Sequence, residues 1–173
     1  MLIRKGSKRK EQAEELLSRA CAQWDRGELR SAFSLLVSSA KLGDGAAQLD
    51  LGYFYDHGLG VKRNRDMAMY WYRRAWRNGH SAGANNIGTI FRDERKPRRA
   101  LAWFLKAVAK GDVDANLEIA KLYMREGWGN AKASRHLKRV IKARPQIICE
   151  YSREQAITLL KKLRRPSAKR KSK

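Results

Sequence analysis

Proline and cysteine are scarce in this sequence of 173 residues, which contains three prolines and two cysteines. Because proline breaks a helix interior, its scarcity leaves long stretches free to form helices. Two thiols are too few for a structural zinc site or a disulfide framework. Cys21 and Cys149 stand in helical, partly apolar settings, so we expect two buried thiols in a reducing cytoplasm, although the pattern alone also permits a disulfide.

Long apolar runs are also absent. No stretch approaches 18 apolar residues, so we expect no transmembrane helix. The first ten residues, "MLIRKGSKRK", are charged and contain no apolar run of seven or more, so we expect no secretory signal. These two observations lead us to expect a cytoplasmic protein.

Motifs for catalysis and for metal or cofactor binding are missing too. The segment "LGYFYDHGLGV" (51–61) contains "GLG", but a dinucleotide fingerprint needs glycine where Arg63 stands, and a P-loop needs Gly-Lys-Ser/Thr. No H-E-x-x-H pattern occurs. We expect His57 to be a solvated turn residue and His136 to pack between helices. We therefore predict no catalytic, metal-binding or cofactor-binding residues and a protein that is not an enzyme.

Acidic residues are few, with 17 Asp and Glu against 39 Lys and Arg and a net charge of +22. Such an excess repels itself and favours an acidic partner. Composition alone does not distinguish nucleic acid, an anionic membrane surface and an acidic protein.

What the sequence does contain is an internal repeat, the first feature to examine in a helical chain. The segments "AFSLLVSSAKLG", "AMYWYRRAWRNG" and "ALAWFLKAVAKG" begin at Ala32, Ala68 and Ala100, and a fourth begins at Ala133. Each has two consecutive residues at the third and fourth steps, which are large and apolar in the first three segments: Leu35-Leu36, Trp71-Tyr72, Trp103-Phe104 and His136-Leu137. We expect these pairs to fill the space between units.

A second motif lies upstream of three of these segments. It reads Leu51-Gly52-x-x-Tyr55, Ile87-Gly88-x-x-Phe91 and Ile119-Ala120-x-x-Tyr123. Each unit is therefore predicted to be two helices joined by a loop. The small residue of the first helix lets another helix approach closely, and a glycine closes the second helix in most units.

This pattern resembles the Sel-one-like repeat, a relative of the tetratricopeptide repeat. The strongest match is one unit, whose matching residues are Leu51, Gly52, Tyr55, Gly58, Gly60, Val61, Asp66, Ala68, Trp71, Tyr72, Ala75 and Gly79. The resemblance implies an all-α, right-handed α-solenoid of about four antiparallel helix pairs plus a C-terminal capping helix. It also makes "GLG" a turn between two antiparallel helices.

The repeats divide the chain into three regions. We predict a basic disordered head at 1–10 and a basic disordered tail at 166–173. The helical-repeat domain lies between them, at 11–163, with a capping helix at 152–165 and with units at about 12–43, 46–79, 82–111 and 114–144. Ser152 is predicted to cap the last helix, which covers the final repeat.

Charge differs between the two kinds of helix. First helices are neutral to acidic, whereas second helices are basic and become more so toward the C-terminus. In a tetratricopeptide-like arrangement, first helices line the concave face and second helices the convex face. The predicted groove residues, at positions that the repeat leaves free, are Asp50, Tyr53, Phe54, Asn86, Ile90, Arg92 and Arg125. The predicted basic face comprises Arg73, Arg74, Arg77, Arg98, Arg99, Lys106, Arg135, Lys138, Arg139 and Lys142.

Two functions are compatible with these features. The resemblance implies a protein-interaction module, acting as an adaptor or as an inhibitor of the immunity type, and the charge favours an acidic partner. The alternative is backbone-directed, salt-sensitive binding of RNA or DNA through the basic face and tails. An anionic membrane surface is a third option, without insertion. The sequence names neither the partner nor the oligomeric state.

Overall fold

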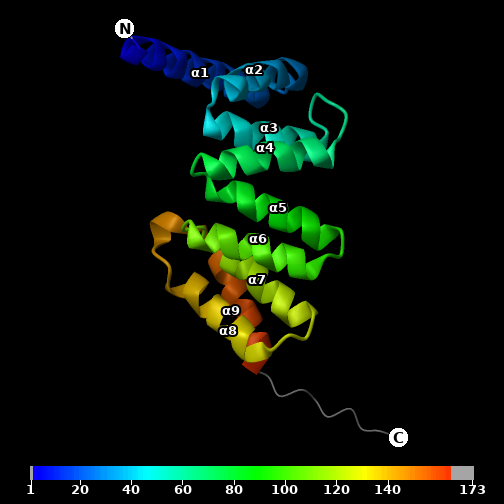
Figure 1. The fold of residues 1–173 in the computed structure, drawn as a ribbon. Coiled ribbons are helices and arrows are strands. Elements are labelled where there is room, and N and C mark those ends of the chain that lie inside the picture. Colours follow the sequence, from blue (N-terminus) through cyan, green and yellow to red (C-terminus); the bar gives the residue numbers. More distant parts are fainter. Residues whose placement is uncertain (1, 165–173) are drawn as a thin grey trace, which may run out of the picture.

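The computed structural model describes residues 2–164, and every regular element in that range is a helix (Figure 1). The elements are α1 (Leu2–Asp25), α2 (Leu29–Leu42), α3 (Gly45–His57), α4 (Arg65–Arg77), α5 (Ser81–Asp93), α6 (Pro97–Ala109), α7 (Asp114–Arg125), α8 (Asn130–Lys142), η1 (Pro145–Ile147) and α9 (Glu150–Arg164). Odd-numbered helices pack antiparallel to the even-numbered helix that follows, and the pairs stack in chain order. The all-α stack of four helix pairs with a closing helix is confirmed, and the handedness of the stack stays a prediction.

The core consists of three apolar clusters that follow one another along the stack. One is centred on Leu36, Leu51 and Phe54, the next on Tyr72 and Phe104, and the third joins α7, α8 and α9. The first two clusters include residues of more than one helix pair, and the third joins the last pair to α9, so every pair buries its apolar side chains against its neighbours. This is the behaviour expected of a repeat stack, in which one unit alone cannot bury its own apolar face.

Two residues predicted to line the groove belong to this core instead. Phe54 is 0% and Ile90 is 1% exposed. Both lie three residues after the first position of the upstream motif, so they share its buried helix face. The fourth unit has Leu122 at the equivalent place, and it is 1% exposed. The repeat therefore defines a further core position on α3, α5 and α7, which the motif comparison overlooked.

The pairs of large residues on the second helices are buried unequally. The second member is fully enclosed in every unit, as Leu36, Tyr72, Phe104 and Leu137. The first member varies, because Trp71 is 7% exposed whereas Trp103 is only half-buried. The Trp103 ring packs edge-on against Trp76, with centroids 5.7 Å apart. Trp103 is therefore less buried than Trp71, although the repeat places the two residues at equivalent positions.

The "GLG" segment is a turn between α3 and α4. Gly58 and Gly60 have φ of 74° and 63°, in the left-handed region that favours glycine. The Gly58 amide donates to the Phe54 carbonyl at 2.8 Å and closes α3. A Cβ on Gly60 would lie 2.4 Å from the Leu29 carbonyl oxygen, so the turn packs directly on the start of α2. The prediction of a structural turn is confirmed.

The predicted disordered head is helical in the structure. α1 begins at Leu2 rather than near residue 11. The segment contains no proline, and its lysines and arginines are good helix formers. Arg9 also donates to the carbonyls of Leu42 and Lys41, which attaches the segment to the C-terminal end of α2. The predicted tail at 166–173 lies outside the described residues.

The start of α9 also differs from the prediction. Cys149, not Ser152, occupies the cap position, because its carbonyl accepts from the Arg153 amide. Its Sγ lies 3.4 Å from the Ser152 amide nitrogen, which donates to it. Ser152 is instead buried inside the first turn. Both cysteines are free and exposed, so the expectation of buried thiols was wrong.

Candidate interaction surfaces

First helices form one continuous side of the stack. Besides its partner α4, α3 contacts α5, and α7 contacts α9 in the same way. We call the solvent-facing side of α1, α3, α5, α7 and α9 the first-helix face. The solvent-facing side of α2, α4, α6 and α8 is the second-helix face.

One ion pair on the first-helix face links two neighbouring units. Arg92 on α5 hydrogen-bonds Glu118 on α7, and Glu118 also accepts from Lys121 at 2.8 Å. A second contact joins Arg92 to Asp93 at 3.0 Å. Because Arg92 is neutralised by two carboxylates, its role is to connect α5 with α7. The guanidinium predicted to contact a partner is thus already paired.

The N-terminal part of this face holds three more of the predicted residues. Asp50 is half-buried, and burial together with nearby Asp44 raises its pKa, an effect that His80 opposes. The Tyr53 ring is 36% exposed and stacks on His57 with centroids 3.9 Å apart. Asn86 is half-buried beside Tyr72. Tyr53 therefore remains open to solvent on α3, whereas Asp50 and Asn86 are each half-buried.

A hollow on the first-helix face lies between α7 and α9. We call it the α7–α9 groove; it has a volume of about 690 Å³ and is lined by Lys121, Met124, Arg125, Asn130, Leu159, Lys162 and Leu163. A hollow of about 430 Å³ adjoins it, sharing Lys121 and Leu159 and adding Tyr151, Glu154, Gln155 and Thr158. The groove has an apolar floor of Met124, Leu159 and Leu163 and a basic rim.

Sequence reasoning found one residue of this groove, Arg125. The structure does not bring Arg125 together with Asp50 and Tyr53, which lie two helix pairs away on α3. The sequence nevertheless contained a pattern that predicts an apolar surface on α9. Leu159 and Leu163 are four residues apart and share one side of α9, which follows the last pair and has no second helix to cover it within the described residues.

The second-helix face is strongly basic. The ten predicted basic-face residues all lie on α4, α6 and α8, and none is within 4.0 Å of a carboxylate among the described residues. Arg65 is the exception on these helices, at 3.9 Å from Asp56. Eight of the ten are exposed, and Arg73 and Arg74 are half-buried. Ion pairs therefore gather on first helices and turns, and unpaired cations on second helices.

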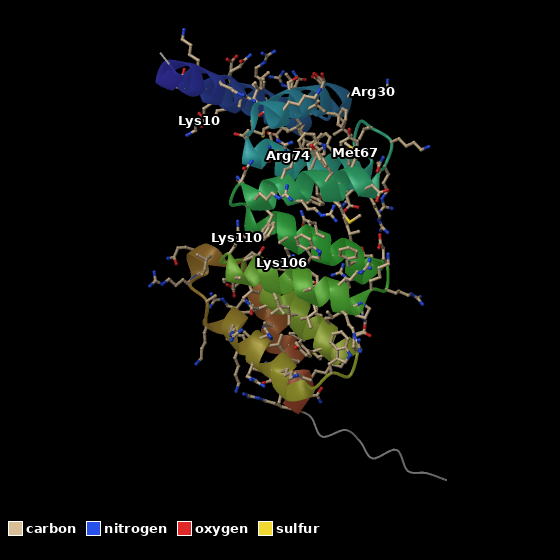
Figure 2. The ribbon with its side chains drawn as sticks, viewed as in Figure 1. Lys10, Arg30, Met67, Arg74, Lys106 and Lys110 are labelled. Atoms are coloured by element: carbon tan, nitrogen blue, oxygen red, sulfur yellow. The ribbon has the colours of Figure 1, made fainter. Side chains whose placement is uncertain are left out.

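Aromatic rings order several of these cations. The Lys106 ammonium lies 4.0 Å from the Trp103 ring centroid and 5.5 Å from that of Trp76. The Arg74 guanidinium lies 5.6 Å from the Trp71 ring and donates to the Tyr70 hydroxyl at 3.0 Å. Such cation–π contacts hold a charge in place while leaving its outer side open to solvent. Figure 2 labels Arg74 on α4 and Lys106 on α6 on the same side of the stack.

A metal centre is lacking in the part of the chain that the structure describes. Among the described residues, no group of three or more His, Cys, Asp or Glu side chains is placed to hold a metal ion. No helix within 2–164 is both long and apolar enough to span a bilayer. His136 is half-buried, its Nδ1 lies 2.9 Å from the Asn116 Oδ1, and its ring stacks on Tyr123. The prediction that His136 packs between helices is confirmed.

Stacked antiparallel helix pairs with an open face on each side define a helical-repeat protein of the tetratricopeptide-like class. The Sel1 repeat model matches residues 4–23, 45–80 and 84–112. The chain therefore belongs to the Sel1 repeat family, whose repeats typically mediate protein interactions. The first matched segment lies within α1, which agrees with the helical state of the basic head.

Similar proteins share this repeat over part of the chain. The ERAD-associated E3 ubiquitin-protein ligase component HRD3B from Arabidopsis thaliana is 31% identical over 112 residues, which cover 64% of this chain and 18% of that protein. A putative sel1-like repeat-containing protein, L21, from Acanthamoeba polyphaga mimivirus is 25% identical over 91 residues, 53% of this chain and 17% of its own length. The chain thus spans less than a fifth of these relatives.

Solved structures show the same fold. A protective antigen from uropathogenic Escherichia coli that displays an SLR fold is 26% identical, with a TM-score of 0.56 over 63% of this chain and 25% of the antigen. A Sel1 repeat protein from Oxalobacter formigenes is 20% identical, with a TM-score of 0.58 over 83% of this chain and 73% of its own. The latter likeness extends the fold assignment over most of the chain.

Proposed function

We propose that this chain is a non-enzymatic protein-interaction module whose partner site is the α7–α9 groove. The observation that supports this is the combination of an apolar floor with a basic rim in one hollow of about 690 Å³. The complementary partner is a protein segment with apolar side chains flanked by Asp or Glu. It would bury the floor residues Met124, Leu159 and Leu163 and place its carboxylates beside Arg125 and Lys162.

The groove is suited to this role because its two sides are formed by packed helices, α7 and α9. Met124 and Leu163 are half-buried and pack against the third apolar cluster, so the floor exists before a partner arrives. A preformed site avoids part of the ordering cost of association. The adjoining hollow of about 430 Å³ lengthens the site along α9. A short helix or an extended segment of a partner fits such a site better than a small molecule.

The rim cations supply charge complementarity. Lys162 is exposed and makes no ion pair within the described residues, and exposed Arg125 is paired only with its neighbour Glu126 at 2.8 Å. Complementary charges at a rim raise the association rate and discriminate against basic partners more than they raise affinity. A net charge of +22 extends the same preference to the whole molecule.

The finer role is proposed as that of an adaptor or of an inhibitor of the immunity type. These two roles differ in whether the partner stays active when the groove is filled, so an activity measurement on the bound partner separates them. We also propose the cytoplasm as the compartment, because both cysteines are free and exposed, and such thiols persist under reducing conditions.

The proposal is tested by reversing the rim charge. Proteins captured by the purified chain after nuclease treatment are identified, and the Kd of each candidate is then measured with purified components. Arg125→Glu/Lys162→Glu should weaken binding by about tenfold or more, because the reversed charges repel the acidic segment and lie beside the floor that it covers. Both side chains are exposed, so the fold should persist, as circular dichroism can verify.

The matched control is Arg26→Glu/Lys62→Glu, which changes the net charge equally at exposed loop residues outside the groove. The control should change affinity far less, and the residual change should disappear in moderate salt. An equal loss of affinity in both variants would show that net charge alone causes the effect. The α7–α9 groove would then not be the partner site.

A further inference from the structure

The repeat places a cation at one register position of three successive second helices. Six residues after the alanine that starts each repeat motif stand Arg74, Lys106 and Arg139. Because α4, α6 and α8 stack in order and run in the same direction, equal register positions align along the stack. The second-helix face therefore carries a line of cations along the repeat axis, which we call the cation ladder.

We propose that the cation ladder is a second binding site, which takes the phosphate backbone of a nucleic acid lying along the repeat axis. The site uses residues other than those of the α7–α9 groove. It is independent of the protein-binding role proposed above, since either site can be present without the other.

Two of the three ladder cations are ordered by neighbouring groups. Arg74 is held by the Tyr70 hydroxyl, and its guanidinium lies 5.6 Å from the Trp71 ring. Lys106 is held by two rings, with the ammonium 4.0 Å from the centroid of Trp103. Ordered side chains lose less conformational entropy on binding. This ordering distinguishes the ladder from the exposed lysines of an ordinary solvated helix.

None of the ladder cations is neutralised within the protein. No carboxylate lies within 4.0 Å of Arg74, Lys106 or Arg139 among the described residues. The second helices carry only one acidic residue, Asp66. Burial, followed by the charges of Arg139 and Arg135, lowers the pKa of neighbouring His136, as a locally positive environment would. A polyanion on this face would relieve repulsion that the chain itself leaves uncompensated.

The linear arrangement favours nucleic acid over the other polyanions. Packed helices lie about 8–10 Å apart, so second helices of adjacent units are at most about 20 Å apart. A duplex about 20 Å long carries roughly twelve phosphates, so each cation of the ladder lies near a phosphate whatever the base sequence. Insertion into a membrane surface instead requires exposed apolar side chains. Within the described residues, α4 and α6 each expose one large apolar side chain, Tyr70 and Leu105, which is too little to insert.

The test compares two triple variants of equal charge. The ladder variant is Arg74→Gln/Lys106→Gln/Arg139→Gln, and the control is Arg26→Gln/Lys62→Gln/Lys161→Gln, at exposed residues outside the ladder. Binding of labelled single-stranded RNA and labelled DNA duplexes of two unrelated sequences is followed by fluorescence anisotropy at about 50 and 200 mM salt. The ladder variant should bind about tenfold or more weakly, equally for both sequences, because phosphate contacts carry no sequence information.

The salt dependence supplies a second readout. On duplex DNA, the ladder variant should have a flatter slope of log affinity against log salt, by about 0.9 for each lost phosphate contact, while the control keeps most of the slope. The charge-retaining variant Arg74→Lys/Lys106→Arg/Arg139→Lys should keep most of the affinity. If circular dichroism shows that the ladder variant is misfolded, Arg139→Gln replaces it, because no ring contact of Arg139 is involved in packing.

Three results would overturn the proposal. Absence of binding by the wild type near physiological salt would remove nucleic acid as a ligand. An equal loss in the ladder and control variants would show that net charge alone attracts the probe. Binding to phosphatidylserine vesicles without binding to RNA or DNA would assign the cations to a membrane surface.

Discussion

At the scale of single residues, Gly52 and Gly88 let the two helices of a pair approach closely. A Cβ on Gly52 would lie 2.5 Å from the ring of Tyr72, and one on Gly88 would lie 2.5 Å from the ring of Phe104. The fourth unit has Ala120 at the equivalent position, and its facing register position holds the smaller Leu137. The size of the first-helix residue and that of the facing second-helix residue therefore vary together, as close packing requires.

We predict that Gly88→Ala will lower the free energy of unfolding by about 1–3 kcal/mol, because the new methyl group overpacks against Phe104. Adding Phe104→Leu should recover part of this loss, since the double variant reproduces the Ala120–Leu137 pairing of the fourth unit. Denaturant titration of the two single variants and the double variant measures the coupling between the sites. If Gly88→Ala is as stable as the wild type or more stable, then the Phe104 ring moves aside for the new methyl group at no cost in stability.

At the scale of elements, the closing helix α9 starts with a weak cap. Its cap residue, Cys149, offers a thiol to the Ser152 amide at 3.4 Å. Sulfur is a weak acceptor, whereas Asp, Asn and Ser are strongly preferred at this position. Because α9 covers the last repeat and forms one side of the α7–α9 groove, the stability of its first turn bears on both the fold and the proposed partner site.

We predict that Cys149→Asp will raise the free energy of unfolding by about 1 kcal/mol, through a stronger cap and a favourable interaction with the helix dipole. Cys149→Ala, which removes the acceptor without adding another, should be less stable than the aspartate variant by a similar amount. Thermal melting of the wild type and the two variants gives their order of stability. If aspartate and alanine melt together, then the cap hydrogen bond contributes nothing to the stability of α9.

At the scale of the whole molecule, charge is divided between two faces. Carboxylates meet cations on first helices and turns, as in the Arg92–Glu118 contact between α5 and α7. Second helices carry cations that have no such partners within the described residues. Within the described residues, unpaired positive charge is therefore concentrated on the second-helix face, where repulsion opposes the folded state.

We predict that raising the KCl concentration from about 0.05 to 0.5 M will raise the Tm, because screening over a few ångströms suppresses repulsion among exposed cations. A gain of about 1 kcal/mol corresponds to a few degrees for a protein of this size. Lys138→Glu/Arg139→Glu/Lys142→Glu, on the most basic helix, should show a smaller rise. A Tm that falls with salt would mean that the ion pairs outweigh the repulsion.

The sequence by itself determined the helical class, the repeat and the division of charge. These features are local, since a helix places Leu51 and Tyr55 on one side within a single turn, and the same spacing recurs in each unit. The "GLG" turn was equally readable, because Gly58 and Gly60 supply backbone conformations that other residues rarely adopt. Local patterns of this kind need no knowledge of what packs against them.

The tertiary structure alone decided which of the predicted groove residues are available to a partner. Phe54 and Ile90 became core because neighbouring units cover them. Arg92 was neutralised by Glu118, which is 26 residues away along the chain. The α7–α9 groove arises where two helices distant in sequence meet, with α8 between them. Such features depend on the relative placement of elements, for which a helical periodicity carries no information, because it specifies the face of each helix but not its neighbour.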